Sequence, residues 1–351
     1  MSLNNLQHLI QTDTDKTLNA FKSKGYKVRS FRELKIISYP YDKEIDDDYV
    51  CFSRGLVFDV NNKKIVCVPP RKSIHVDKID DIEVNDTYVF EELIDGTMIN
   101  VFWYQDQWLI STRTEIGGYN KWNGKKSFRT LFNECLDFNL DQLNKEYSYS
   151  FVMRHTENRN IAPIEKNELY LVEMYDGLNC IEPEYYPNFC KTVNKTNDIQ
   201  TILYNLNNSK YLKGYTLKLK DKRYKIVNHN FEEIKKIKTN RNNLFLTYLD
   251  LRKNGKLKEY LVHFTENKNL FETYRDKVHM LSNDIYSNYK DIFIYKKKDK
   301  KEISYNLKPF IYEIHKLYLK DKKPIQWNDI KNYVHDLESK RIYFSISHGD
   351  Y

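Results

Sequence analysis

Alternating hydrophobic and polar residues dominate the first two thirds of the chain, and a helical repeat takes over near residue 240. Alternation predicts strands in 26–40, 49–59, 65–68, 88–114, 147–154, 169–174 and 213–227. Helical spacing predicts helices in 1–25, 125–145, 191–210, 270–292, 310–317 and 327–337. We therefore expect an α+β domain over residues 1–238 and an all-helical C-terminal domain over residues 239–351.

Composition is typical of a globular protein with a substantial core. The 351 residues are 40% hydrophobic and 30% charged. Neither an early apolar leader nor an uninterrupted run of about 18 apolar residues occurs, so we expect a cytoplasmic protein with no membrane partner. The five cysteines are scattered, without a C-x-x-C pair, which predicts free thiols and no structural metal site.

Positive charge is concentrated in one part of the chain. Residues 213–300 contain 22 Lys and Arg against 11 Asp and Glu, whereas the whole chain has a net charge of +8. A basic segment interleaved with tyrosines is typical of a protein that binds nucleic-acid phosphates. A solvated lysine-rich surface would produce the same charge pattern, so charge alone leaves both interpretations open.

The segment 88–114 combines two alternating runs around Asp95-Gly96-Thr97 with a third run ending in Ser111-Thr112-Arg113. It resembles the nucleotide-binding motif of the covalent nucleotidyltransferases, the superfamily of RNA ligases, DNA ligases and mRNA capping enzymes. The signature of that superfamily is Lys-x-Asp-Gly-Ser/Thr, and Leu93 stands here at the position of the nucleophilic lysine. The resemblance implies a ligase adenylation-type fold with antiparallel sheets, and the helical C-terminal domain resembles that of phage-type and viral RNA ligases.

Further motifs follow the family order over roughly residues 30–235. Arg54-Gly55 and the Pro69–Lys72 segment precede the nucleotide motif, and an Asn158-Arg159 loop follows it. The resemblance implies the following nucleotide-binding or RNA-binding residues: Arg54, Lys72, Asp95, Gly96, Arg113, Arg159, Lys218 and Lys225. It also implies four losses, because Leu93, Ser150 or Val152, Lys213 and Val227 stand where the family has lysine, glutamate, glutamate and lysine.

These losses predict a protein that is not an enzyme. Leucine has no atom that can attack the α-phosphate of ATP, and the family's metal-binding acids are missing, so we predict no catalytic residue, no metal and no cofactor. The remaining cations predict a cleft that binds RNA, with an RNA 5′ end or cap as the suggested ligand. Composition and resemblance also suggest a large-DNA-virus protein, located in the host cytoplasm or virus factory.

Two alternatives stay open from the sequence. An active RNA ligase that uses ATP and Mg²⁺ would need a lysine from elsewhere in the chain. The other alternative is a structural or partner-binding protein without a nucleic-acid role, and the sequence identifies no protein partner. Neither G-x-x-x-x-G-K-S/T nor G-x-G-x-x-G occurs, so P-loop and Rossmann nucleotide binding have no support.

Overall fold

A computed structural model of the chain describes residues 2–40, 48–82, 88–122, 124–219, 222–238 and 241–349. It divides into two compact units, Met1–Glu233 and Ile234–Tyr351. The division lies inside helix α5 (His229–Lys238), and the boundary predicted from the sequence lies at the end of the same helix. The two units are described separately below.

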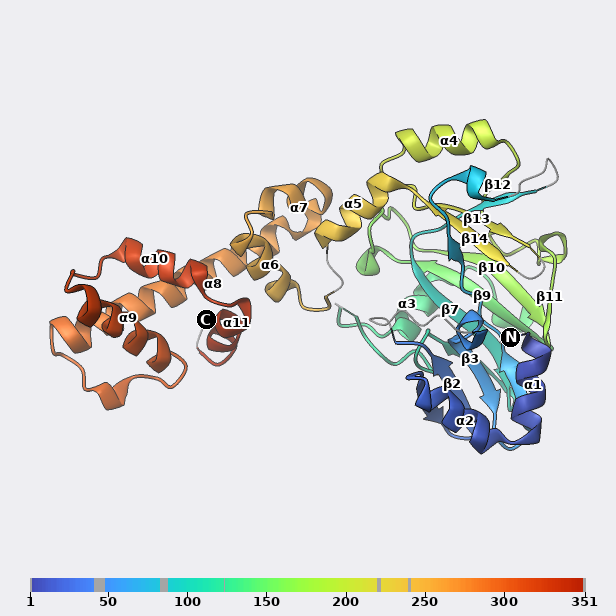
Figure 1. Cartoon of the computed structure of the whole chain (residues 1–351), viewed down its shortest axis with the longest axis horizontal. Helices are drawn as coiled ribbons and strands as arrows, with labels where there is room; N and C mark the ends of the chain where they lie inside the picture. Colours follow the sequence, from blue (N-terminus) through green and yellow to red (C-terminus); the bar gives the residue numbers. More distant parts are fainter. Residues whose placement is uncertain are drawn as a thin grey trace. The chain divides into compact units, whose positions relative to one another are not determined.

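Three sheets form the first unit (Figure 1). The first has the order β1-β2-β3-β4, with bounds Lys27–Phe31, Leu34–Ser38, Arg54–Asp59 and Lys64–Cys67. The second has the order β11-β10-β9-β7-β8, with bounds Asn179–Cys180, Glu168–Asp176, Tyr147–Arg154, Thr97–Tyr104 and Gln107–Ser111. The third has the order β12-β6-β13-β14-β5, with bounds Lys195–Thr196, Phe90–Glu92, Gly214–Lys218, Arg223–Val227 and Ile74–His75. Only β14 and β5 pair in parallel among the described strands, which confirms the predicted α+β class with antiparallel sheets.

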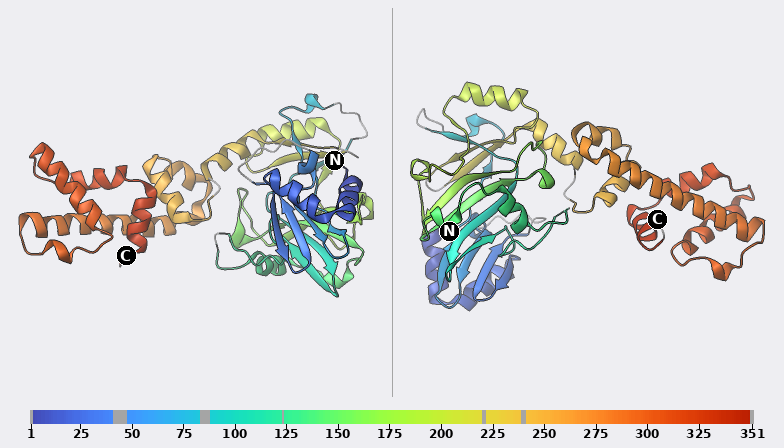
Figure 2. Two further views of the ribbon diagram at one scale, coloured as in Figure 1. Left: turned by 60° about the horizontal axis from the view of Figure 1, so that its bottom comes forward. Right: turned by 180° about the vertical axis from the view of Figure 1, so that it is seen from behind.

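Each sheet buries an apolar face against a helix (Figure 2). Helices α1 (Leu3–Thr12) and α2 (Thr14–Ser23) pack on the first sheet, and α3 (Phe128–Cys135) packs on the second. Helix α4 (Ile199–Asn208) places the fully buried Ile202 against β6, β13 and β14. The first and second sheets also pack on each other through a core that includes Val57 and Phe102.

Two predicted elements at the N-terminus are each divided in the structure. The predicted helix over 1–25 is wrong in its continuity, because Asp13 adopts an extended conformation between α1 and α2. Its carboxylate accepts a hydrogen bond from the Lys16 amide and so caps α2, which is a common role of aspartate. The strand followed by a loop that is expected over 26–40 is instead a hairpin, β1 and β2, with Arg32 at its turn.

Other predicted elements are too long. The helix expected over 125–145 is limited to α3, and Leu140–Gln142 forms a separate 3-10 turn. Residues 49–51 belong to a 3-10 turn instead of a strand, and the helix expected over 191–210 is preceded by β12. The acidic run Glu44–Asp48, whose composition predicts a turn, lies almost entirely outside the described residues.

The second unit is helical, as predicted. Its helices are α6 (Leu244–Lys253), α7 (Leu257–His263), α8 (Lys268–Tyr289), α9 (Lys308–Asp321), α10 (Trp327–Asp336) and α11 (Ser339–Ser347). The long helix expected over 270–292 corresponds to α8 and to the π-helical turn Lys290–Ile294 that continues it. Helix α8 passes beside α9, α10 and α11 (Figure 2). In the described part of the chain, no helix has the length and apolar character needed to cross a membrane.

Candidate functional site

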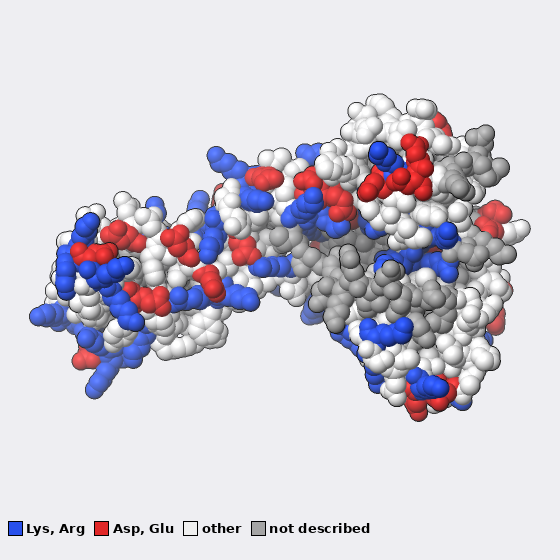
Figure 3. Space-filling view, viewed as in Figure 1, with Lys and Arg blue, Asp and Glu red and all other residues white. Residues whose placement is uncertain are grey.

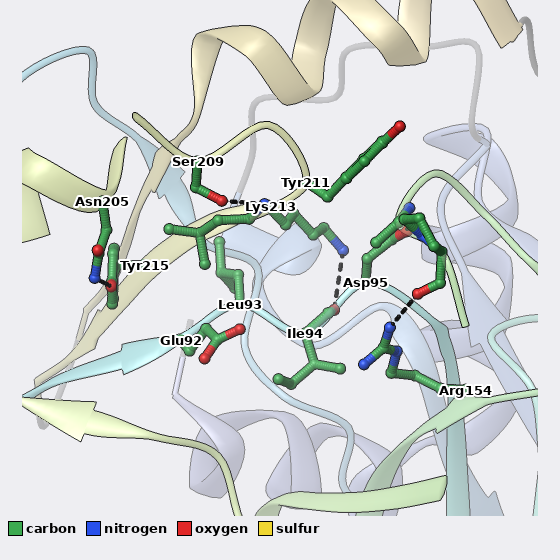
Figure 4. A pocket seen from close by; sticks show the side chains of 13 residues that line it. Glu92, Leu93, Ile94, Asp95, Arg154, Asn205, Ser209, Tyr211, Lys213 and Tyr215 are labelled. Carbon is green, nitrogen blue, oxygen red and sulfur yellow. Dashed lines mark hydrogen bonds between the residues drawn. The ribbon is translucent and has the colours of Figure 1, made fainter. Parts of the chain in front are cut away.

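Leu93 lines a cavity of about 370 Å³ at the edge of the third sheet (Figure 4). It follows β6, and its amide donates a hydrogen bond to the Gly214 carbonyl at the start of β13. This pairing brings Lys213, the residue before Gly214, to the same cavity. The Lys213 ammonium lies 3.4 Å from the Ile94 carbonyl oxygen. A lysine from a different strand therefore lies beside the leucine that occupies the expected position of the nucleophile.

Asp95 and Gly96 organise the loop that follows β9. Asp95 Oδ2 accepts hydrogen bonds from the amides of Ile161 (2.7 Å) and Ala162 (2.9 Å). Arg159 donates to the Ile161 carbonyl, so it belongs to the same loop. A Cβ on Gly96 would lie only 2.4 Å from the Met153 carbonyl oxygen, which explains why glycine is required there. These three predicted binding residues thus have evident structural roles.

Arg54, Lys72 and Arg113 meet around Tyr39. The guanidinium of Arg113 lies 4.1 Å from the Tyr39 ring centroid and donates to the Tyr39 carbonyl, and the Lys72 ammonium lies 5.5 Å from the same ring. Gly55 has a φ of +113°, and a Cβ on it would lie 3.3 Å from Arg113 Cα. This close approach of β3 to the end of β8 needs glycine, and it brings Arg54 near Arg113.

A second group of charges lies between the second and third sheets. The Glu173 carboxylate, only 3% exposed, pairs with Arg223 at 2.9 Å and with Lys218 at 3.9 Å. Lys218 also pairs with Glu91 at 2.6 Å and donates to the Val172 carbonyl. Glu91, Glu173, Lys218 and Arg223 line a cavity of about 890 Å³, together with Arg71. Lys218, predicted to bind phosphate, is therefore already held by two carboxylates.

Arg54 connects the two groups. Burial lowers the pKa of its guanidinium, and the positive charges of Arg223 and Arg113 lower that pKa further. Tyr39 and Glu173 act in the opposite direction. Arg113 and Arg223 are thus close enough to Arg54 to disfavour its charge. Among the described residues, Lys218 pairs with Glu91 and Glu173, and Arg223 pairs with Glu173.

The structure therefore distributes the eight predicted residues over separate places. Arg54, Lys72 and Arg113 are brought together, whereas Asp95, Gly96 and Arg159 form a second group and Lys218 belongs to the cavity between the sheets. Lys225 lies two residues after Arg223 on β14, so alternation places both side chains on the same face of the strand. Leu93 shares its cavity with Asp95 and with none of the predicted cations.

Three functional candidates were missed from the sequence. Glu173 lies on β10 directly opposite Ser150 of β9, so a glutamate is present beside the position where one was thought to be lost. Arg223 was passed over in favour of Lys225, although its pairing with Glu173 makes it central. Lys213 was interpreted only as the loss of an acid. A sequence signal existed for Arg223 and Lys213, since both lie in the predicted strand segment 213–227, but the signal for Glu173 needed the strand pairing.

Within the described ranges, no group of three or more His, Cys, Asp or Glu side chains is arranged to hold a metal ion. All five cysteines are free thiols. The predicted lack of a metal and of a cofactor stays a prediction.

Comparison with known proteins gives only structural neighbours. No protein-family model matches the chain, and no curated protein matches it. The chain is similar to a putative ATP-dependent DNA ligase from Aquifex aeolicus, with 13% identity, coverage of 79% of this chain and 81% of that chain, and a TM-score of 0.46. It is also similar to an archaeal ATP-dependent RNA ligase in two forms. Form 1 has 10% identity, coverage of 74% and 70%, and a TM-score of 0.47; form 2 has 9% identity, coverage of 78% and 76%, and a TM-score of 0.48. These neighbours are DNA and RNA ligases of low sequence identity, and neither a phage-type relationship nor the loss of the lysine follows from the similarity.

Proposed function

We propose that the chain binds RNA through phosphate contacts in its first unit, without transferring a nucleotide. The observation that carries this proposal is the cluster of Arg54, Arg113 and Lys72 around Tyr39, with Arg223 close enough to Arg54 to lower the pKa of its guanidinium. A phosphate group placed among these guanidiniums would relieve their mutual repulsion, and arginine binds phosphate through paired N–H groups. The Lys72 ammonium, 5.5 Å from the Tyr39 ring centroid, adds a further cation.

The proposal treats the site as non-catalytic because Leu93 supplies no nucleophile. RNA is the proposed ligand, and a phosphorylated 5′ end or a cap is the end structure that the cationic group would favour. A viral origin and a cytoplasmic location stay predictions.

Binding of a short 5′-phosphorylated single-stranded RNA tests the proposal. We expect affinity to fall steeply with salt, since phosphate binding releases counterions. The variants Lys72→Gln and Arg113→Gln should each reduce the slope of log affinity against log salt by about 0.7. Arg29→Gln is the matched control, because Arg29 is an exposed arginine on β1 of the same unit.

Thermal unfolding of every variant separates lost contacts from lost fold. Equal RNA affinity for Lys72→Gln, Arg113→Gln and Arg29→Gln would refute the assignment to the Tyr39 group. Undetectable RNA binding by the intact chain at low salt would refute the function itself.

Lys213 supports a second candidate function, an active nucleotidyltransferase with a displaced lysine. Its amine lies in the cavity that Leu93 and Asp95 line. In such an enzyme the deprotonated amine would form an N–P bond to the α-phosphate of ATP while the bond to pyrophosphate breaks. Incubation with α-labelled ATP and Mg²⁺ discriminates the two functions. A covalent label that is lost in Lys213→Arg would establish the second and refute the non-catalytic assignment, whereas an unlabelled chain refutes the second.

A further inference from the structure

The strongest unexplained surface lies in the helical unit, where the end of α8 meets α9. We define the lysine tip as residues 290–301 and 315–323. It contains ten lysines and three aspartates. The side chains of residues 294–301 and 316–323 are all exposed. Figure 3 shows Lys and Arg side chains gathered at this end of the helical unit, with fewer Asp and Glu among them.

Ring contacts hold the two segments of the tip together. The rings of Phe293 and His315 stack with their centroids 3.7 Å apart. The ring of Tyr318, on the same helix as His315, stacks with its centroid 5.9 Å from that of His315. The π-helical turn Lys290–Ile294 brings Phe293 to this position, and such turns are frequent at functional sites. Burial lowers the pKa of His315, and the charges of Lys300 and Lys322 lower it further. Lysines from both segments are therefore close to one another.

Several ammonium groups of the tip lie over aromatic rings. Lys290 is 4.5 Å from the Tyr286 ring centroid, Lys297 is 5.2 Å from that of Tyr295, and Lys300 is 5.3 Å from that of Phe293. Within the part of the chain that the structure describes, Lys290, Lys297, Lys300 and Lys322 form no ion pair with a carboxylate. Their charge is therefore available to an external anion.

Exposed rings accompany these cations. Tyr295 is 53% exposed and Tyr318 is 36% exposed. Proteins that bind single strands combine cations that follow the phosphates with rings on which bases stack. A lysine held about 5 Å from a ring places both kinds of contact within the length of one nucleotide. An acidic peptide would use the cations but would bring no planar group to the exposed tyrosine rings.

We propose that the lysine tip is a docking surface for single-stranded nucleic acid, separate from the site in the first unit. Phosphates contact Lys297, Lys300 and Lys322, and bases stack on Tyr295 and Tyr318. This inference does not depend on the cationic group of the first unit, because all residues involved belong to the helical unit.

The test measures binding of the full chain to an RNA oligonucleotide and to a DNA oligonucleotide of the same sequence. The triple variant Lys297→Gln/Lys300→Gln/Lys322→Gln should reduce the salt slope for the single strands by about 2. Its matched control, Lys256→Gln/Lys258→Gln/Lys268→Gln, removes three exposed lysines elsewhere in the same unit and should retain the slope. Tyr295→Ala/Tyr318→Ala should weaken binding about thirtyfold or more, whereas Tyr185→Ala, at a 72% exposed tyrosine, should not.

Equal slopes for the two triple variants would overturn the proposal. Full affinity of the tyrosine double variant would overturn the stacking assignment. Binding to phosphatidylserine vesicles that is lost in the tip variant, with oligonucleotide binding unchanged, would identify a lipid surface as the partner and refute the inference. The Lys72→Gln and Arg113→Gln variants are measured in the same assay. They distinguish a failure of this proposal from a failure of the proposed function, because the salt slope can change in one set of variants and stay unchanged in the other.

Discussion

Replacing Glu173 with glutamine tests the charge arrangement on which the proposed function depends. Glu173 is the only carboxylate paired with Arg223 among the described residues, and both side chains are at most 10% exposed. Lys218 is affected less, because its 2.6 Å pair with Glu91 remains. Glutamine can still accept the hydrogen bond from Tyr175. The loss is therefore the charge opposite one buried guanidinium, and we expect Glu173→Gln to reduce the free energy of unfolding by about 3 kcal/mol.

Urea unfolding followed by tryptophan fluorescence measures this change. Three of the four tryptophans, Trp103, Trp108 and Trp122, belong to the first unit, so a Trp327→Phe background restricts the signal to that unit. The exposed Glu146 provides the matched control, and Glu146→Gln should change the free energy by less than about 0.5 kcal/mol. The double variant Glu173→Gln/Arg223→Gln should lose less than the sum of the two single variants, with a coupling of about 1 to 3 kcal/mol. A Glu173→Gln variant as stable as the control would refute the buried pair.

Three further predictions concern the loop after β9 and the first sheet. Gly96→Ala should cost about 2 kcal/mol or more in urea unfolding, because its Cβ would lie 2.4 Å from the Met153 carbonyl oxygen, whereas Gly124→Ala, whose nearest contact is 3.9 Å away, should be nearly neutral. Asp95→Ala should reduce the free energy of unfolding by about 2 kcal/mol. It should also accelerate hydrogen exchange of the Ile161 and Ala162 amides, which donate hydrogen bonds to the Asp95 carboxylate; unchanged exchange would contradict this role of Asp95. Burial raises the pKa of Asp59, but hydrogen bonds from Tyr104 and Asn62 outweigh burial, so the folded pKa is lowered. Its stabilisation is then present above about pH 4 and is lost as the pH falls through the folded pKa, and Asp59→Asn should weaken the acid dependence of unfolding.

Although the two-residue strands β5, β11 and β12 were missed, sequence patterns predicted the longer strands of the first unit. The segment 88–114 illustrates this, since Asn100 and Phe102 face the first sheet while Ile99 and Val101 face α3. Helix lengths were predicted less well. The residues of 125–145 have a helical spacing only as far as Cys135, and the hydrophobic residues beyond it, including Leu143, pack on the same core from an irregular segment.

The candidate site was only partly predictable for a different reason. A motif indicates which residues are present, but each side chain's partner depends on strand register. Glu173 and Ser150 are 23 positions apart in sequence and become neighbours only because β9 and β10 pair, with a bulge between Leu171 and Glu173. Likewise, the Asp95 carboxylate accepts hydrogen bonds from two amides of a loop that lies more than sixty residues later in the sequence. Such long-range partners leave no local pattern to read.

Competition between internal and external anions ranks the cations of the first unit. A phosphate that approaches Lys218 must displace two carboxylates, and one that approaches Arg223 must displace a buried carboxylate at 2.9 Å. Lys72 instead lies 5.5 Å from the Tyr39 ring centroid, and a neutral ring is a weaker competitor for a cation than a carboxylate. Phosphate contacts in the first unit should therefore begin at Lys72. Lys218→Gln should therefore alter stability more than RNA affinity. If Lys218→Gln instead lowers RNA affinity more than Lys72→Gln does, the ion pairs of Lys218 open when RNA binds.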